Sequence, residues 1–224
     1  MNNTSFDLVI FDCDGVLVDS EHLADQVYVQ MLKEYGFSVN TAAYLQEFAG
    51  VALPKRLEVT ARKLNWTPPA EFIPLFLERM SALSEKELQA VPGIHDLITS
   101  LTVPFCVASN GSRAEIVHRL KVARLTEQFG DAIFSGMEVP HPKPAPDVFL
   151  AAARAFQIPP SRCVVIEDSL LGVNAGVRAG MKVYGHATFN SAESLRAAGA
   201  IPFANMLELK TILNNTKQVI ERAQ

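Results

Sequence analysis

The hydrophobic positions of this chain alternate between short apolar runs and longer amphipathic stretches. The short runs are rich in β-branched or aromatic residues and end at turn-forming residues, which is typical of buried strands. They are LVIF (8–11), PFCVAS (104–109), AIF (132–134), CVVI (163–166), KVYG (182–185) and IPFA (201–204). Because most of them are apolar throughout rather than at every second position, we expect both faces of the sheet to be covered.

The stretches that separate these runs have the pattern of helices. They span residues 92–101, 112–121, 146–157, 169–179, 191–198 and 205–222. Strands and helices therefore alternate over most of the chain. This order predicts an α/β fold with a doubly wound, Rossmann-like parallel sheet.

One segment interrupts the alternation. From residue 20 to residue 87 the sequence has helix patterns and no convincing strand. The first of these helices carries an apolar stripe at i, i+4 spacing that begins at Leu23, and Gly36 after the stripe predicts the end of this helix. Further helices are expected near 41–48, 54–64 and 69–86. We predict an all-helical cap domain over 20–87, inserted into a core domain made of 1–19 and 88–224.

Composition and charge narrow the class of protein. The chain has 224 residues, of which 49% are hydrophobic and 20% charged, as in ordinary globular domains. Its net charge of −4 argues against nucleic acid or an acidic membrane as the main partner. No apolar run approaches the roughly 20 residues of a membrane helix, and the N-terminal residues lack a signal-peptide pattern. Three widely spaced cysteines indicate free thiols. We expect a cytoplasmic monomer or weak oligomer.

Polar residues follow the first four predicted strands. In open parallel sheets the ligand lies beyond the carboxyl ends of the strands, so these side chains are expected to meet there. In chain order they are Asp12 and Asp14, then Ser109 and Asn110, then Lys143 within HPKPAPD (141–147), then Glu167 and Asp168. Each group alone also fits an ordinary turn or helix start. Four such groups at successive strand ends favour a single catalytic site.

These residue types suit Mg²⁺ and a phosphoryl group bound together. Mg²⁺ prefers oxygen ligands, commonly one or two carboxylates with phosphate oxygens and water. Asp12 and Asp168 would supply the carboxylates, with Glu167 as a direct or outer-shell helper. Lys143 would offset the phosphate charge, and Ser109 would hold a phosphate oxygen. We therefore predict Mg²⁺ as cofactor and a small phosphorylated metabolite as partner.

The two aspartates of the first turn divide the chemistry. An aspartate attacks phosphorus to form an aspartyl-phosphate, and a second acid must protonate the leaving alkoxide and later deprotonate water. Asp12 is the predicted nucleophile and Asp14 the predicted acid/base. Residues two apart face the same side of an extended chain, so the spacing fits this division.

Four segments resemble the motifs of the haloacid dehalogenase-like superfamily. They are DCDGVLVDS (12–20), SN (109–110), KPAPD (143–147) and EDSLLGVNAG (167–176). The resemblance covers essentially the whole chain and implies a helical cap after the first motif. It also implies that the Asp14 carbonyl binds the metal, that Asn110 contacts the phosphate with Ser109 and Lys143, and that Asp168 completes the metal site with Glu167.

Subfamilies of this superfamily differ at a few positions. The dehalogenases lack an acid at the position of Asp14. The sugar-phosphate mutases have a histidine on the first cap helix where this chain has Ala24, whereas SGMEV (135–139) is similar to bacterial sugar-phosphate phosphatases, 6-phosphogluconate phosphatase among them. We predict a Mg²⁺-dependent phosphatase of sugar or polyol phosphates. The alternative is a sugar-phosphate mutase resembling β-phosphoglucomutase.

Candidates for recognising the leaving group come from the cap. They are Glu21, His22, Lys55 and Arg56, and an exposed surface role fits each of them equally well. Two other classes also remain open. A signalling receiver domain uses similar residues but lacks an inserted cap. A catalytically inactive binding protein would have the same fold without phosphatase activity. Turnover of a phosphate ester separates both classes from a phosphatase.

Overall fold

The protein divides into two compact units. A computed structural model describes residues 6–48, 53–188 and 190–221. One unit, the core unit, contains Met1–Val18 and Gln89–Gln224. The other, the helical unit, contains Asp19–Leu88. No helix in the described part of the chain is both long and apolar enough to span a bilayer.

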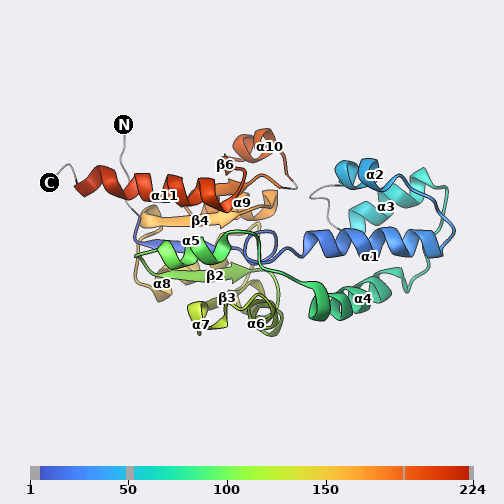
Figure 1. Ribbon diagram of the computed structural model, residues 1–224, viewed down its shortest axis with the longest axis horizontal. Coiled ribbons are helices and arrows are strands. Elements are labelled where there is room, and N and C mark those ends of the chain that lie inside the picture. Colours follow the sequence, from blue (N-terminus) through green and yellow to red (C-terminus); the bar gives the residue numbers. More distant parts are fainter. Residues whose placement is uncertain (1–5, 49–52, 189, 222–224) are drawn as a thin grey trace. The chain divides into compact units, whose positions relative to one another are not determined.

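The core unit contains a parallel sheet with six strands in the order β3-β2-β1-β4-β5-β6 (Figure 1). The strands are β1 (Leu8–Phe11), β2 (Phe105–Ser109), β3 (Ile133–Ser135), β4 (Cys163–Glu167), β5 (Lys182–His186) and β6 (Ile201–Phe203). Strand β1 is central: Phe11 pairs with Val107 of β2 on one side and with Ile166 of β4 on the other. The predicted doubly wound parallel sheet is confirmed.

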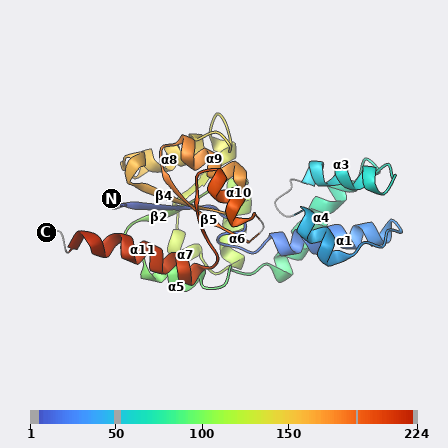
Figure 2. The same cartoon turned by 90° about the horizontal axis from the view of Figure 1, so that it is seen from above.

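Helices cover both faces of this sheet. They are α5 (Ile94–Ser100), α6 (Arg113–Val122), α7 (Thr126–Phe129), α8 (Asp147–Ala155), α9 (Leu170–Arg178), α10 (Ala192–Ala197) and α11 (Met206–Glu221). In Figure 2, α8 and α9 lie on one face of the sheet, and α5, α7 and α11 lie on the other. All four residues of β1 are buried, which explains its uniformly apolar sequence. The short helix α7 was not predicted, because four residues are too few to show a helical period.

Capping residues start two of these helices close behind the strands. Ser112 accepts a hydrogen bond from the backbone N–H of Glu115, and the Glu115 carboxylate accepts one in return, which forms a capping box before α6. Ser169 accepts a hydrogen bond from the Gly172 N–H before α9. The turns after β2 and β4 are therefore short, and their polar residues stay at the edge of the sheet.

The helical unit has a core of aromatic side chains. Its helices are α1 (Glu21–Glu34), α2 (Thr41–Phe48), α3 (Leu53–Lys63) and α4 (Phe72–Glu87). The Tyr28 ring stacks on Tyr44 and meets Phe72 edge-on. Trp66, the single tryptophan of the chain, packs against Tyr35 and Phe72. Aromatic packing of this kind supplies much of the buried apolar area in a unit of this size.

A buried arginine lies within this aromatic core. Arg56 is only 6% exposed, and its Nη1 donates to Asp25 Oδ1 at 2.6 Å. Its guanidinium carbon lies 4.2 Å from the centroid of the Tyr28 ring, in cation–π contact. The charge of Arg56 is thus balanced inside the unit by one carboxylate and an aromatic face.

Arg56→Met is expected to destabilise the helical unit by about 3 kcal/mol, because it leaves the half-buried Asp25 carboxylate without its partner. The neighbouring Lys55 pairs with Glu58 at the surface and is 58% exposed, so Lys55→Met serves as the control with an expected effect below about 0.5 kcal/mol. Urea unfolding followed by Trp66 fluorescence reports on this unit. Equal effects of the two substitutions would contradict a structural role for the Arg56–Asp25 pair.

Candidate active site

The turn after β1 carries the first two acids. The Asp12 N–H donates to Ile166 O at 2.9 Å, so the backbone of Asp12 continues the strand, and the residue is 8% exposed. Asp14 follows and is half-buried. Gly15 then has a φ of +70°, and its N–H donates to Val18 O at 2.8 Å. A left-handed residue at this point closes a tight turn, which favours glycine.

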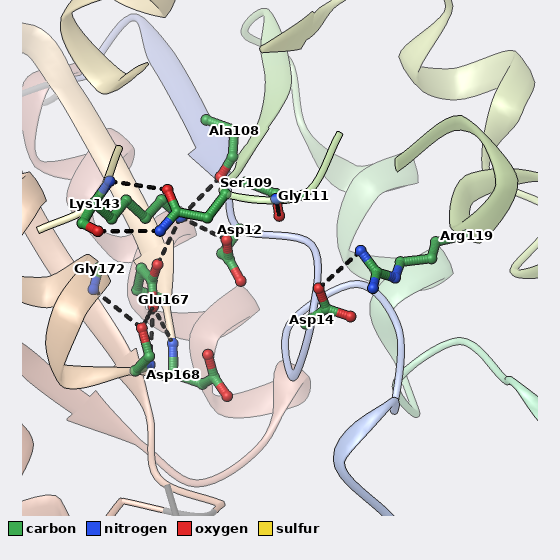
Figure 3. A network of polar contacts seen from close by, with 12 residues as sticks. Asp12, Asp14, Ala108, Ser109, Gly111, Arg119, Lys143, Glu167, Asp168 and Gly172 are labelled. Atoms are coloured by element: carbon green, nitrogen blue, oxygen red, sulfur yellow. Dashed lines mark hydrogen bonds and ion pairs between the residues drawn. The ribbon is translucent and has the colours of Figure 1, made fainter. Parts of the chain in front are cut away.

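Lys143 connects three strand ends through one ammonium group (Figure 3). Its Nζ donates to Asp12 Oδ1 at 2.5 Å, to Glu167 Oε1 at 2.8 Å and to the Ala108 carbonyl at 2.9 Å. All three donors of the ammonium group are therefore used. Burial by itself would lower the pKa of Lys143, but the two carboxylates outweigh it and raise this pKa. Lys143 is a permanent positive charge in the site.

Negative charge still exceeds positive charge around Lys143. Burial, against the opposing charge of Lys143 and with the added effect of the Glu167 and Asp14 carboxylates, raises the pKa of Asp12 to about 7. Oxygen atoms of Asp12, Glu167 and Asp168 lie within 4.8 Å of one another, and all three residues are buried. One lysine does not balance three carboxylates, so this donor set fits a hard divalent cation such as Mg²⁺.

Glu167 is the most constrained member of this cluster. Its Oε2 accepts hydrogen bonds from Asp168 N, Ser169 N and Ser169 Oγ, each at 2.9 Å, and its Oε1 accepts from Lys143. A Cβ at Gly172 would lie 1.6 Å from Glu167 Oε1, so only glycine leaves room for this carboxylate. Because four hydrogen bonds occupy Glu167, Asp12 and Asp168 are the better candidates for direct metal ligation.

The residues at the end of β2 hold the lysine segment. The Asn110 side chain accepts from Lys143 N at 2.9 Å and donates to Lys143 O at 3.1 Å. Ser109 is 3% exposed, and its Oγ accepts from the Gly111 N–H at 3.2 Å. The structure thus brings Ser109 and Asn110 to the same sheet edge as Lys143. Their contact with a phosphate stays a prediction, and the observed role of the Asn110 side chain is to fix residue 143.

Arg119 of α6 is a site residue that the sequence did not indicate. Its Nη1 lies 3.2 Å from Asp14 Oδ2, and Figure 3 shows the two side chains facing each other. Partial burial would lower the pKa of Arg119, but the carboxylates of Asp14 and its neighbours raise it. An arginine on a helix rich in charged residues is usually a solvated surface residue, so no pattern distinguishes Arg119 in the sequence.

The candidates for leaving-group recognition belong to the helical unit. His22 is exposed and hydrogen-bonded to Gln26 at 2.8 Å, and it lines a cavity of about 610 Å³ beside α1 and α4. Lys55 is exposed and Arg56 is buried, as described above. Glu21 begins α1, but its side chain lies outside the described residues. The roles of these four residues in substrate recognition stay predictions.

Gly15→Ala is expected to reduce activity on the order of 100-fold, because a Cβ at Gly15 would lie 2.0 Å from Asp168 Oδ2 and displace that carboxylate. Gly180 has a similar φ of +74° with no atom near the added Cβ, so Gly180→Ala is the matched control for backbone strain. We expect Gly15→Ala to be about 1–2 kcal/mol less stable than the control in thermal unfolding. Equal stability and activity of the two variants would contradict this close approach.

Known proteins resemble this chain over most of its length. Residues 9–186 match the family described as haloacid dehalogenase-like hydrolase. A 6-phosphogluconate phosphatase of Escherichia coli is 32% identical over 79% of this chain and 80% of its own length. A phosphorylated carbohydrates phosphatase of Thermotoga maritima is 28% identical over 95% of this chain and 99% of its own length. The crystal structure of a HAD family hydrolase of Deinococcus radiodurans, with bound phosphate and sodium, has a TM-score of 0.84 and 33% identity, covering 95% of this chain and 97% of that one.

Proposed function

This chain belongs to the haloacid dehalogenase-like hydrolase family, and we propose that it is a Mg²⁺-dependent phosphatase of small phosphorylated carbohydrates. It is a phosphoric monoester hydrolase, as its named relatives are. The observation that carries the proposal is the ammonium group of Lys143, bound to both Asp12 and Glu167 beside the buried acidic cluster. That arrangement pairs a fixed positive charge with a carboxylate nucleophile at one strand edge.

The residues of the core unit would act in two steps. Asp12 attacks phosphorus, and the bond from phosphorus to the ester oxygen breaks while Asp14 donates a proton to the leaving alkoxide. Asp14 then takes a proton from water, which attacks the aspartyl-phosphate, releases phosphate and restores Asp12. Ser109 holds a phosphate oxygen in both steps, and the positive charge of Lys143 offsets the charge of the phosphate. Asp12, Asp168 and the Asp14 carbonyl would hold Mg²⁺, which would supply further positive charge to offset that of the phosphate.

The names of two relatives support a carbohydrate phosphate as the substrate class. Both curated relatives described above are named for phosphorylated carbohydrates or a sugar acid phosphate. We assign recognition of the leaving group to the helical insertion, predicted as residues 20–87. A sugar or polyol phosphate, with 6-phosphogluconate among the first to try, is the proposed substrate.

The mutase alternative needs a group in the cap that moves protons to and from the sugar. In the sugar-phosphate mutases that this chain resembles, that group is a histidine at the position of Ala24. Ala24 lies on α1, partly buried against the aromatic core of the helical unit, and its methyl group cannot transfer a proton. An alanine at this position therefore favours a phosphatase, which transfers the phosphoryl group to water, over a mutase.

Phosphate release from a panel of sugar, polyol and nucleotide monophosphates, measured with Mg²⁺ and with EDTA, tests the proposal. We expect release that depends on Mg²⁺ and is fastest for the carbohydrate esters. Absence of release from every ester would contradict the phosphatase assignment. Isomerisation of a sugar phosphate in the presence of a bisphosphate primer would then identify a mutase, and inactivity in both assays would leave a binding protein.

A further inference from the structure

His186, the last residue of β5, holds the turn that carries Asp14. It is 4% exposed, and its Nδ1 lies 2.9 Å from the Gly15 carbonyl oxygen. A carbonyl oxygen only accepts, so the proton of this hydrogen bond belongs to Nδ1. The imidazole also stacks on Phe203 of β6, with ring centroids 5.0 Å apart and planes 6° apart. The ring is therefore fixed from two sides.

The hydrogen bond from His186 completes the restraint of Gly15. The N–H of Gly15 already donates to Val18 O at 2.8 Å, so both peptide groups of Gly15 are held. The Gly15 N–H shares a rigid peptide plane with the Asp14 carbonyl. Fixing the two peptide groups of Gly15 therefore fixes the direction in which the Asp14 carbonyl points.

A second residue, Asn190, holds the other side of the acidic cluster. Asn190 lies in the connection between β5 and α10, and its Nδ2 donates to the Asp168 carbonyl at 2.9 Å. Asp168 in turn approaches Gly15 closely, since a Cβ at Gly15 would lie 2.0 Å from its Oδ2. His186 and Asn190 thus contact the backbone of both turns that carry the carboxylates.

We propose that His186 and Asn190 form a clamp that sets the spacing between the two carboxylate-bearing turns and thereby the affinity of the site for a divalent cation. This inference rests on the proposed function, because the divalent cation is the Mg²⁺ that the proposed phosphatase requires. Both residues act on backbone carbonyls, so they are positioning residues that do not touch the substrate. Loss of a group that orients metal ligands typically lowers metal affinity about 10- to 100-fold.

Two substitutions at position 186 separate the hydrogen bond from the packing. His186→Phe keeps a planar ring on Phe203 but removes the donor. His186→Asn loses the ring but places an amide N–H near the position of Nδ1. Asn190→Ala removes the second contact at a half-buried position, where the fold tolerates truncation better. His118→Phe, at an exposed histidine, and Asn174→Ala, whose Nδ2 donates to the Leu170 carbonyl within α9, are the controls.

The experiment measures Mn²⁺ binding to the full metal-free chain by electron paramagnetic resonance. Hydrogen exchange of residues 14–18 is followed in the same preparations. We expect the Kd for Mn²⁺ to rise about 10-fold or more in His186→Phe and Asn190→Ala, with faster exchange of the turn in His186→Phe. His186→Asn should recover most of the affinity, and both controls should bind as the wild type does.

Three outcomes would overturn the clamp. Unchanged Mn²⁺ affinity in both His186→Phe and Asn190→Ala would do so. So would equal losses in His186→Asn and His186→Phe, because packing alone would then account for the effect. Unchanged exchange of residues 14–18 in His186→Phe is the third. A wild-type chain that binds no Mn²⁺ and releases no phosphate contradicts the proposed function instead, and the exchange measurement, which needs no metal, then decides on the clamp.

Discussion

Asp12→Asn is expected to abolish phosphate release, with kcat lowered on the order of 10⁴-fold or more, while the fold remains intact. An amide cannot form the aspartyl-phosphate, so the loss reflects chemistry rather than binding. The Asn side-chain oxygen still accepts a hydrogen bond from Lys143, which keeps its contact with Glu167. Because Asp12 is buried among other carboxylates, removing its charge should not destabilise the metal-free protein.

The measurement combines kinetics with direct detection of the intermediate. Acid quenching of the wild type during turnover, followed by mass spectrometry of its peptides, should find a phosphorylated peptide that contains Asp12. The variant should show none. Asp131→Asn, at an exposed aspartate of the core unit, is the control and should keep full activity. Near-normal turnover of Asp12→Asn would rule out the two-step mechanism proposed here.

Lys143→Met is expected to lower stability and activity together. Lys143 is 6% exposed, and its removal leaves the buried carboxylates of Asp12 and Glu167 without their shared partner. Leaving buried charges unpaired in this way costs about 3–5 kcal/mol of unfolding free energy. Since Lys143 also supplies positive charge to the phosphate, kcat/KM should fall on the order of 10³-fold.

Chemical denaturation in EDTA and in Mg²⁺ separates these effects. Mg²⁺ should restore part of the lost stability of Lys143→Met, because a bound cation offsets the same carboxylates. Lys121→Met, at an exposed lysine of α6, is the control and should change the unfolding free energy by less than about 0.5 kcal/mol. If Lys143→Met were as stable as the wild type in EDTA, the ion pairs of Lys143 with Asp12 and Glu167 would not stabilise the fold as we expect.

The sequence predicted the parts of the site that strand order alone brings together. Asp12 and Asp168 directly follow β1 and β4, Lys143 lies in the loop after β3, and parallel strands place their carboxyl ends at one edge. The strands of the sheet and most of its helices were predicted from the hydrophobic periodicity of the sequence. These features depend on local pattern and on one general rule of topology.

Other parts of the site depend on contacts that no local pattern encodes. Arg119 reaches Asp14 from α6, and His186 reaches Gly15 from β5, across sequence separations that carry no motif. Arg56 lies in a helix, LPKRLEVTARK, whose composition indicates a solvated surface, yet its neighbours in space are Tyr28 and Asp25. Burial of a cation is decided by its partners in space, and its residue type alone predicts the opposite.

The central place of β1 has a consequence for the order of assembly during translation. Strand β1 is made first but pairs with β2 on one side and with β4, which begins at Cys163, on the other. The helical unit, Asp19–Leu88, is complete on the ribosome long before β4 emerges. The edge of β1 that pairs with β4 therefore stays unpaired until β4 is synthesised, and until then Asp12 and Asp14 lack their neighbours Glu167 and Asp168. A nascent chain that ends before β4 is expected to be inactive and dependent on chaperones that shield its exposed strands.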